Sequence, residues 1–145
     1  MEKEKKREFG EKTDGLVIIS IIIKKGEDIA LISSGTIISE VLEAAKKLEE
    51  KGVSVEVVSM HTIKPLDEDY LLKASNKFKM LITIEEHGKI GGLGGAVAEW
   101  KSNNDIKITH QIFGTPDEFM HEVGSQEYAR EKYGLVADNI ANKVY

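Results

Sequence analysis

The residues with the clearest capacity for chemistry lie in one stretch, EEHGKIGGLGGAVAEW, which runs from Glu85 to Trp100. It opens with two carboxylates and an imidazole. Glu85 and Glu86 cannot both address one substrate atom, because neighbours at the end of a strand point to opposite faces. Glu86 beside His87 is the better candidate for proton chemistry, since a carboxylate can set the tautomer of an imidazole. We favour the alternative, a strand-end carboxylate that only binds loop amides.

Glycines in the same stretch indicate either an anion site or a tight turn into a helix. Free backbone N–H groups at the positive end of a helix attract phosphate. The dinucleotide pattern is only partly matched, because Val97 stands at its third glycine position, and no Gly-Lys-Ser or Gly-Lys-Thr completes a P-loop. Positive φ angles and close helix-to-sheet approach explain the same glycines, and we favour this structural interpretation. The candidate ligand or interface residues are Glu86, His87, Gly91, Gly92, Gly94 and Gly95.

The rest of the chain carries no recognised catalytic or metal-binding pattern. It has no cysteine, which excludes disulfides, thiolate metal sites and cysteine nucleophiles. The remaining histidines, which are His61, His110 and His121, lack metal-binding spacing. Hydroxyls follow a predicted strand at Ser33, Ser34 and Thr36, but a GxSxG motif is absent. Helix capping is therefore the expected role of these hydroxyls.

Length and charge limit the domains, the partners and the compartment. The 145 residues suit one domain, and 20 basic against 25 acidic residues give a formal net charge of -5. Nucleic acid and anionic membranes are therefore not expected partners. We expect residues 1–15 to be a charged flexible tail and residues 16–145 to form the domain. The apolar run Leu16–Ile23 is far shorter than the roughly 20 residues of a membrane span, and no targeting segment is recognisable, which predicts a cytoplasmic protein.

Alternating strands and helices must position these residues. Short apolar runs predict strands at Leu16–Ile23, Ile29–Ser33, Val53–Ser59, Lys79–Glu85 and Ile106–Ile112, of which Val53–Ser59 alternates in polarity. Apolar residues spaced three and four positions apart predict helices between the strands. Gly52 is expected to end the first helix, Asp67 to cap the second helix, and Ser125 to cap a helix near the carboxyl end. Right-handed crossovers then give an α/β three-layer sandwich, with a mainly parallel sheet of about five strands and helices on both faces. Leu16–Ile23 is expected at an edge.

Four loops leave the carboxyl ends of these strands. They are SSGT at 33–36, MHTIKPLD at 60–67, EEHGKIGGLGG at 85–95 and FGTPDEF at 113–119. Ligands of such sheets usually bind at this edge, so the loops are expected to gather there.

Taken in order, the segments resemble a known family. The succession ALISSGT, VEVVSMHTIKPLD, LITIEEHGKIGGLGGAVAE, FGTPDEF and GSQEYAREKYGL is similar to the carboxyl-terminal domain of transketolase and related thiamin-diphosphate-dependent enzymes. Relatives include deoxyxylulose phosphate synthase and the beta subunits of 2-oxo-acid dehydrogenases. The resemblance extends from Glu27 to the end of the chain. It implies a mainly parallel sheet with one antiparallel strand.

The resemblance also implies a non-catalytic domain that supports the dimer of an enzyme moving a two-carbon ketol unit between sugar phosphates. In the family, thiamin diphosphate and a divalent metal are held by a GDG motif with a downstream Asn, in pyrimidine- and diphosphate-binding domains. Here only a TDG occurs, at residues 13–15. The chain alone is therefore expected to bind no cofactor. Its expected partners are those domains, in the same enzyme or a partner subunit, within a homodimer.

Two further interpretations stay open. The first is that the chain is the carboxyl-terminal domain of a deoxyxylulose phosphate synthase or of a 2-oxo-acid dehydrogenase beta subunit, which it also resembles; in the dehydrogenases this domain contacts a partner acyltransferase. The second is that the chain is a stand-alone regulatory module that binds a nucleotide or sugar phosphate at Gly91–Gly95. Many relatives carry a basic residue where this chain has His110 and Gln111, and a capping Thr where it has Val136, so neither an anion contact nor a side-chain cap is expected there.

Overall fold

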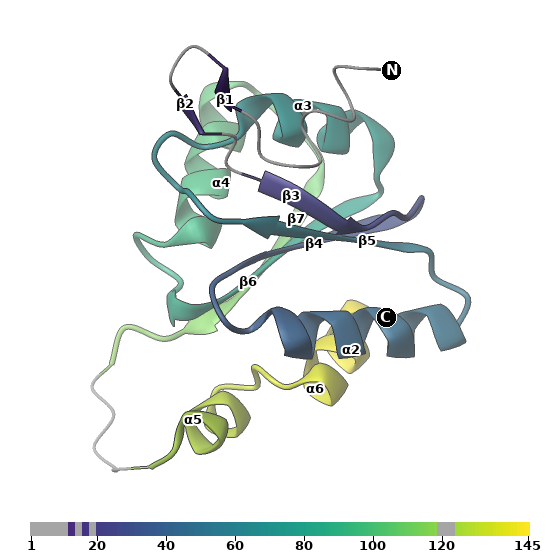
Figure 1. The fold of residues 1–145 in the computed structure, drawn as a ribbon, viewed down its shortest axis with the longest axis vertical. Helices are drawn as coiled ribbons and strands as arrows, with labels where there is room; N and C mark the ends of the chain where they lie inside the picture. Colours follow the sequence, from purple (N-terminus) through teal and green to yellow (C-terminus); the bar gives the residue numbers. More distant parts are fainter. Residues whose placement is uncertain (1–11, 14–15, 18–19, 119–123) are drawn as a thin grey trace.

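Five strands of the described chain form the main sheet, and their carboxyl ends position the candidate site. The computed structural model describes residues 12–13, 16–17, 20–118 and 124–145. In order across the sheet, the strands are β3 (Ser20–Lys24), β5 (Val55–Met60), β4 (Ile29–Ser34), β6 (Met80–Gly88) and β7 (Thr109–Thr115). β3 pairs antiparallel with β5, and the other pairs are parallel (Figure 1). The predicted sheet, with its antiparallel edge strand, is confirmed.

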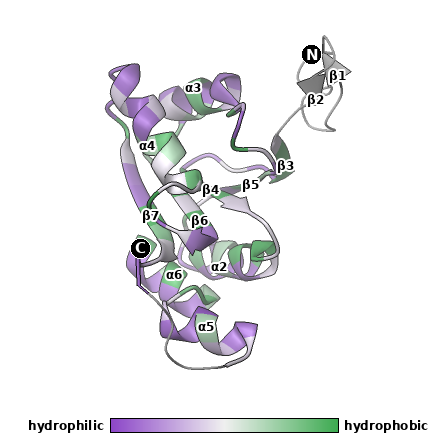
Figure 2. Cartoon of the chain, turned by 90° about the vertical axis from the view of Figure 1, so that its left-hand side faces the viewer, coloured by the Kyte–Doolittle hydropathy of each residue, from purple (hydrophilic) through white to green (hydrophobic). Residues whose placement is uncertain are grey.

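Helices cover both faces of this sheet, which completes the predicted three layers (Figure 2). α2 (Ile38–Glu50) and α6 (Ala137–Val144) pack on one face. α3 (Glu68–Lys77) and α4 (Leu93–Asn103) pack on the other. α5 (Gln126–Lys132) lies beside α6, on the α2 side of the sheet, and contributes no buried residue (Figures 1 and 2).

Burial explains where two strands differ from their sequence patterns. Polarity alternates along Val53–Ser59, yet every residue of β5 is buried, including Glu56 and Ser59, because helices cover both faces. β7 begins at Thr109, three residues after the predicted start at Ile106. Ile106 and Ile108 are apolar because they pack against the α3 and α4 core before the strand begins.

The predicted helix boundaries are confirmed at several residues. Gly52 follows α2 with a φ of 87°. The Asp67 carboxylate accepts a hydrogen bond from the Tyr70 N–H at 3.0 Å and caps α3. The Ser125 hydroxyl accepts one from the Tyr128 N–H at 3.2 Å and caps α5. Asp67 and Ser125 therefore mark the starts of α3 and α5, whereas α2 begins without a side-chain cap.

The predicted strand Leu16–Ile23 corresponds to two separate strands. β2 (Leu16–Val17) pairs antiparallel with β1 (Lys12–Thr13), outside the main sheet. β3 then begins at Ser20 and occupies the predicted edge, while residues 18–19 lie outside the described residues. The predicted flexible tail, residues 1–15, also falls almost entirely outside them. Among the described residues, no helix combines the length and apolar composition of a membrane span.

Candidate functional site

The four predicted loops leave one edge of the sheet, because β5, β4, β6 and β7 are parallel neighbours. Ser34 and Glu85 are partners in the parallel β4–β6 ladder, which brings the loops at 33–36 and 85–95 together. The Lys89 N–H donates to the Thr115 carbonyl at 3.0 Å and ties in the loop that starts at residue 113. The loop at 60–67 leaves the same edge, because β5 runs parallel to β4 with Ser59 opposite Ser33, and Asp67 accepts a hydrogen bond from the hydroxyl of Ser20, which is paired with Met60 at the end of β5. Glu86 and the glycine segment therefore lie at the shared edge.

Glu85 fills the position where a phosphate would bind to α4. The residue is fully buried, and its two carboxylate oxygens accept hydrogen bonds from the N–H groups of Leu93, at 3.0 Å, and Gly94, at 2.8 Å. These amides open α4, where the helix dipole favours a negative charge. The favoured interpretation from sequence assigned amide binding to Glu86, but in the described structure Glu86 is bound by side chains, and it is Glu85 that binds amides. The phosphate-binding capacity of this helix end is taken up by the protein itself.

Close packing accounts for the glycines around Glu85. A Cβ atom on Gly92 would lie 2.0 Å from Glu85 Oε1, and one on Gly94 would lie 2.5 Å from Ile112 Cγ2. Gly91 has a φ of 80°, which larger residues rarely adopt. The geometry agrees with the structural interpretation of the segment. A ligand or partner at these glycines stays a prediction.

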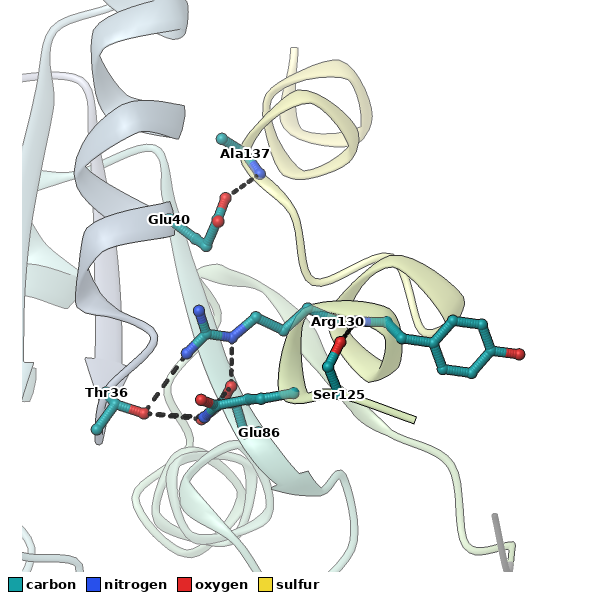
Figure 3. A network of polar contacts seen from close by, with 8 residues as sticks. Thr36, Glu40, Glu86, Ser125, Arg130 and Ala137 are labelled. Atoms are coloured by element: carbon teal, nitrogen blue, oxygen red, sulfur yellow. Dashed lines mark hydrogen bonds and ion pairs between the residues drawn. The ribbon is translucent and has the colours of Figure 1, made fainter. Parts of the chain in front are cut away.

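Glu86 points to the other face and anchors a cluster with Thr36, Gln126 and Arg130 (Figure 3). The Thr36 hydroxyl donates to Glu86 Oε2 at 3.0 Å. The Gln126 amide donates to both carboxylate oxygens, at 3.1 and 3.0 Å, and Arg130 Nε is bonded to Oε1. We call these four residues the Glu86 cluster. It joins the end of β6 to α5 and to the turn before α2.

Electrostatics make this cluster an anchor rather than an acid–base pair. Burial alone raises the pKa of the Glu86 carboxyl, but hydrogen bonds from Arg130, Thr36 and Gln126 and the charge of Arg130 outweigh it, so the pKa is lowered. The side chains of Glu86 and Arg130 are 23% and 13% exposed. A carboxylate that is ionised and fully hydrogen bonded is a poor proton acceptor at neutral pH. His87 is exposed, and the described structure has no hydrogen bond between it and Glu86.

Sequence reasoning missed most of the partners of Glu86. Thr36 was expected to cap a helix, but α2 has no side-chain cap and Thr36 binds Glu86 instead. Gln126 and Arg130 were not singled out. The Ser125 cap could have indicated them, because it fixes the start of α5 and so places residues 126 and 130 one turn apart on the same face.

Glu40 supplies the cap that Val136 cannot. α6 begins after Val136 without a cap from its own segment, and the Glu40 carboxylate of α2 accepts a hydrogen bond from the Ala137 N–H at 2.9 Å (Figure 3). The start of α6 is thus fixed through a neighbouring helix. This contact also attaches the carboxyl-terminal helix to α2.

The histidines show structural rather than metal-binding surroundings. His110 Nε2 lies 2.9 Å from the Thr83 hydroxyl, and burial, followed by the charge of Lys101, lowers its pKa from 6.5 to about 4. His61 Nδ1 lies 3.5 Å from the Ser59 hydroxyl, and His121 is outside the described residues. Within the described ranges no group of three acidic or histidine side chains could hold a metal ion.

Comparisons with known proteins agree on one family. Residues 20–140 match the family model described as "Transketolase, C-terminal domain". The chain is 35% identical over 124 residues to 6-deoxy-6-sulfo-D-fructose transketolase subunit SqwH of a Clostridium species, covering 86% of this chain and 38% of that protein. It is 32% identical over 120 residues to 1-deoxy-D-xylulose-5-phosphate synthase of Heliobacterium modesticaldum, covering 83% of this chain and 18% of the synthase.

A solved structure supports the same grouping. "Split gene transketolase, inactive beta4 tetramer" superposes with a TM-score of 0.79 at 35% identity, over 86% of this chain and 40% of that one. The chain therefore spans two fifths or less of the length of these relatives. Since the family match covers most of the chain and includes both the Glu85 segment and the Glu86 cluster, the chain belongs to the transketolase C-terminal domain family.

Proposed function

We propose that the chain is the non-catalytic carboxyl-terminal domain of a thiamin-diphosphate-dependent transketolase. The observation that carries the proposal is the family match over residues 20–140, supported by 35% identity to a split-gene transketolase. The parent enzyme transfers a two-carbon ketol unit between sugar phosphates. Its pyrimidine- and diphosphate-binding domains lie in the same enzyme or in a partner subunit.

The glycine segment of this chain does not fit the diphosphate of thiamin diphosphate. A diphosphate needs free amides at a helix N-terminus, whereas Glu85 occupies the amides of Leu93 and Gly94. Glu86, the other acid of the segment, is bound by Arg130 and Gln126. The cofactor and its divalent metal are therefore assigned to the partner domains, and no catalytic step is assigned to a residue of this chain.

The proposed contribution of the chain is to complete a cytoplasmic homodimer. The candidate interface comprises Glu86, His87 and the glycines Gly91, Gly92, Gly94 and Gly95. Ile90, between them, is 82% exposed. Self-association through this edge would bury it.

Reconstitution tests this function. The purified chain, given thiamin diphosphate, magnesium and sugar phosphates, is expected to show no ketol transfer. Adding a polypeptide with the two cofactor-binding domains is expected to give activity that requires this chain. Ile90→Asp should lower the restored rate, while Leu72→Asp, at a 50% exposed leucine of α3, should not. Activity of the chain alone, or equal activity of the partner without it, contradicts the proposal.

The likeness to the synthase favours a second candidate, the same domain of a 1-deoxy-D-xylulose-5-phosphate synthase. Assays of the reconstituted enzyme for both products separate the two. A stand-alone module at Gly91–Gly95 has less support, since the carboxylate of Glu85 already binds the amides that a phosphate ligand would need.

A further inference from the structure

A cavity of about 230 Å³ lies between β3 and α3, on the sheet face opposite the Glu86 cluster. Its walls come from the edge strand, from β5 and from one side of α3. The volume is below the roughly 300–1,000 Å³ of sites for drug-sized ligands, so any occupant is smaller than a nucleotide. The cavity plays no part in the proposed function, and the inference does not rest on that function.

Glu56 gives the cavity a buried carboxylate with spare capacity. Its side chain is 5% exposed, and Oε2 accepts a hydrogen bond from the Tyr70 hydroxyl at 2.9 Å. Oε1 lies 3.8 Å from Lys77 Nζ, which is too far for a hydrogen bond. A buried carboxylate costs free energy unless its oxygens are hydrogen bonded. Oε1 is thus an acceptor suited to a hydroxyl group in the cavity.

The other polar groups of the inner wall are already committed. Burial, followed by the negative charge of Glu56, raises the pKa of Tyr70 well above its usual value, so its hydroxyl remains a donor to Glu56. Asp67 also lines the cavity, but its oxygens bind the Tyr70 N–H and the Ser20 hydroxyl. Glu56 Oε1 is therefore the inner polar atom that a ligand can use.

Lysines on α3 give the same cavity a positive side. Lys73 and Lys77 are one helical turn apart and both line it. Lys73 forms no ion pair with any residue in the described part of the chain, and Lys77 lies 3.6 Å from Glu27. An ammonium group binds phosphate as a point charge. Ile22 and Phe78 add apolar surface suited to a carbon chain.

We propose that this cavity binds a small phosphorylated polyol. Its phosphate lies at Lys73 and Lys77, and one of its hydroxyl groups donates to Glu56 Oε1. Sugar phosphates of about five carbons belong to this class and suit a cavity smaller than a nucleotide site. Such a site needs no catalytic residue. Binding would stabilise α3 and β3, so the stability of these elements would rise with the ligand concentration.

Titration calorimetry of the chain with ribose 5-phosphate tests the proposal. Saturable binding is expected, and inorganic phosphate and ribose should each bind about tenfold more weakly, because each lacks one half of the contacts. Glu56→Gln replaces the free acceptor with a donor and should weaken ribose 5-phosphate by about tenfold. Lys73→Glu reverses the charge at the mouth and should weaken it by a similar factor. Lys143→Gln, on α6, is the matched control and should leave affinity unchanged.

Three results would overturn the site. One is no saturable binding of ribose 5-phosphate, and another is unchanged affinity in the Lys73→Glu variant. The third is equal affinity for inorganic phosphate and ribose 5-phosphate, which would remove the role of Glu56. Lys73 is exposed, so its variant keeps the test decisive even where Glu56→Gln fails to fold.

Discussion

Glu85 and Glu86 are adjacent, yet one is buried against α4 and the other is ion-paired with α5. The alternation of side chains along β6 separates them, and that much follows from the sequence. The partners do not, because Arg130 comes from a helix far along the chain. Residue types indicated which groups were polar, whereas packing between distant elements decided what each one binds.

At the residue scale, Gly94 should tolerate no side chain. Gly94→Val would place atoms into Ile112 and the Thr83 hydroxyl, with the first contact at 2.5 Å. Overpacking of this kind costs about 1–3 kcal/mol, so the midpoint of urea unfolding should fall.

Gly95 provides the matched comparison. The nearest atom to a Cβ there lies at 3.4 Å, an ordinary contact, so Gly95→Ala should be neutral or stabilise the helix by up to about 1 kcal/mol. Equal losses for both variants would contradict the close-approach explanation of Gly94.

At the scale of elements, α5 is attached to the sheet through the Glu86 cluster. It has no buried residue, and its Arg130 and Gln126 side chains contact Glu86 and Thr36. A short helix of this kind has little stability of its own. The position of α5 therefore depends on the Glu86 cluster.

Breaking the ion pair should release α5 while the sheet stays folded. Arg130→Gln and Glu86→Gln are each expected to speed amide exchange at residues 126–132, with global stability falling by no more than about 1 kcal/mol, because the pair is near the surface. Glu127→Gln, at an exposed position of the same helix, should leave exchange unchanged. Unaltered exchange in both cluster variants would show that other contacts hold α5.

The sequence predicted elements better than it predicted their contacts. Buried parallel strands, the caps at Asp67 and Ser125 and the edge position of β3 follow from local patterns, and all are observed. The start of β7 was missed because Ile106 and Ile108 pack against the core before the strand begins. The division of Leu16–Ile23 into β2 and β3 was missed as well. The Glu40 cap on α6 depends on tertiary packing and leaves no local signal.

At the scale of the whole molecule, acid should destabilise the fold in two stages. In the folded chain the pKa of His110 is lowered from 6.5 to about 4, so the unfolded chain binds more protons between these values. Stability is therefore present above pH 6.5 and is lost as pH falls through this window. The lowered pKa values of Glu86 and Asp28 add a further loss below the ordinary carboxyl range.

Urea unfolding over a pH series from 7.5 down to about 2.5, which spans both stages, checks this. His110→Asn should remove the first stage and leave the second, whereas His61→Asn, at an exposed position, should preserve both. A His110→Asn profile parallel to that of the parent protein between pH 6.5 and 5 would exclude His110 as the source.

The carboxylate of Glu85 has a consequence for how glycine-rich turns are interpreted. A helix N-terminus of this kind is a receptor for anions, but here the receptor and its anion belong to the same polypeptide and are joined permanently by folding. Dissolved phosphate must then compete for the Leu93 and Gly94 amides with the Glu85 carboxylate, which is always present because it is part of the same chain. An acidic residue at the last buried position of the preceding strand is thus a simple sign that such a turn is self-occupied.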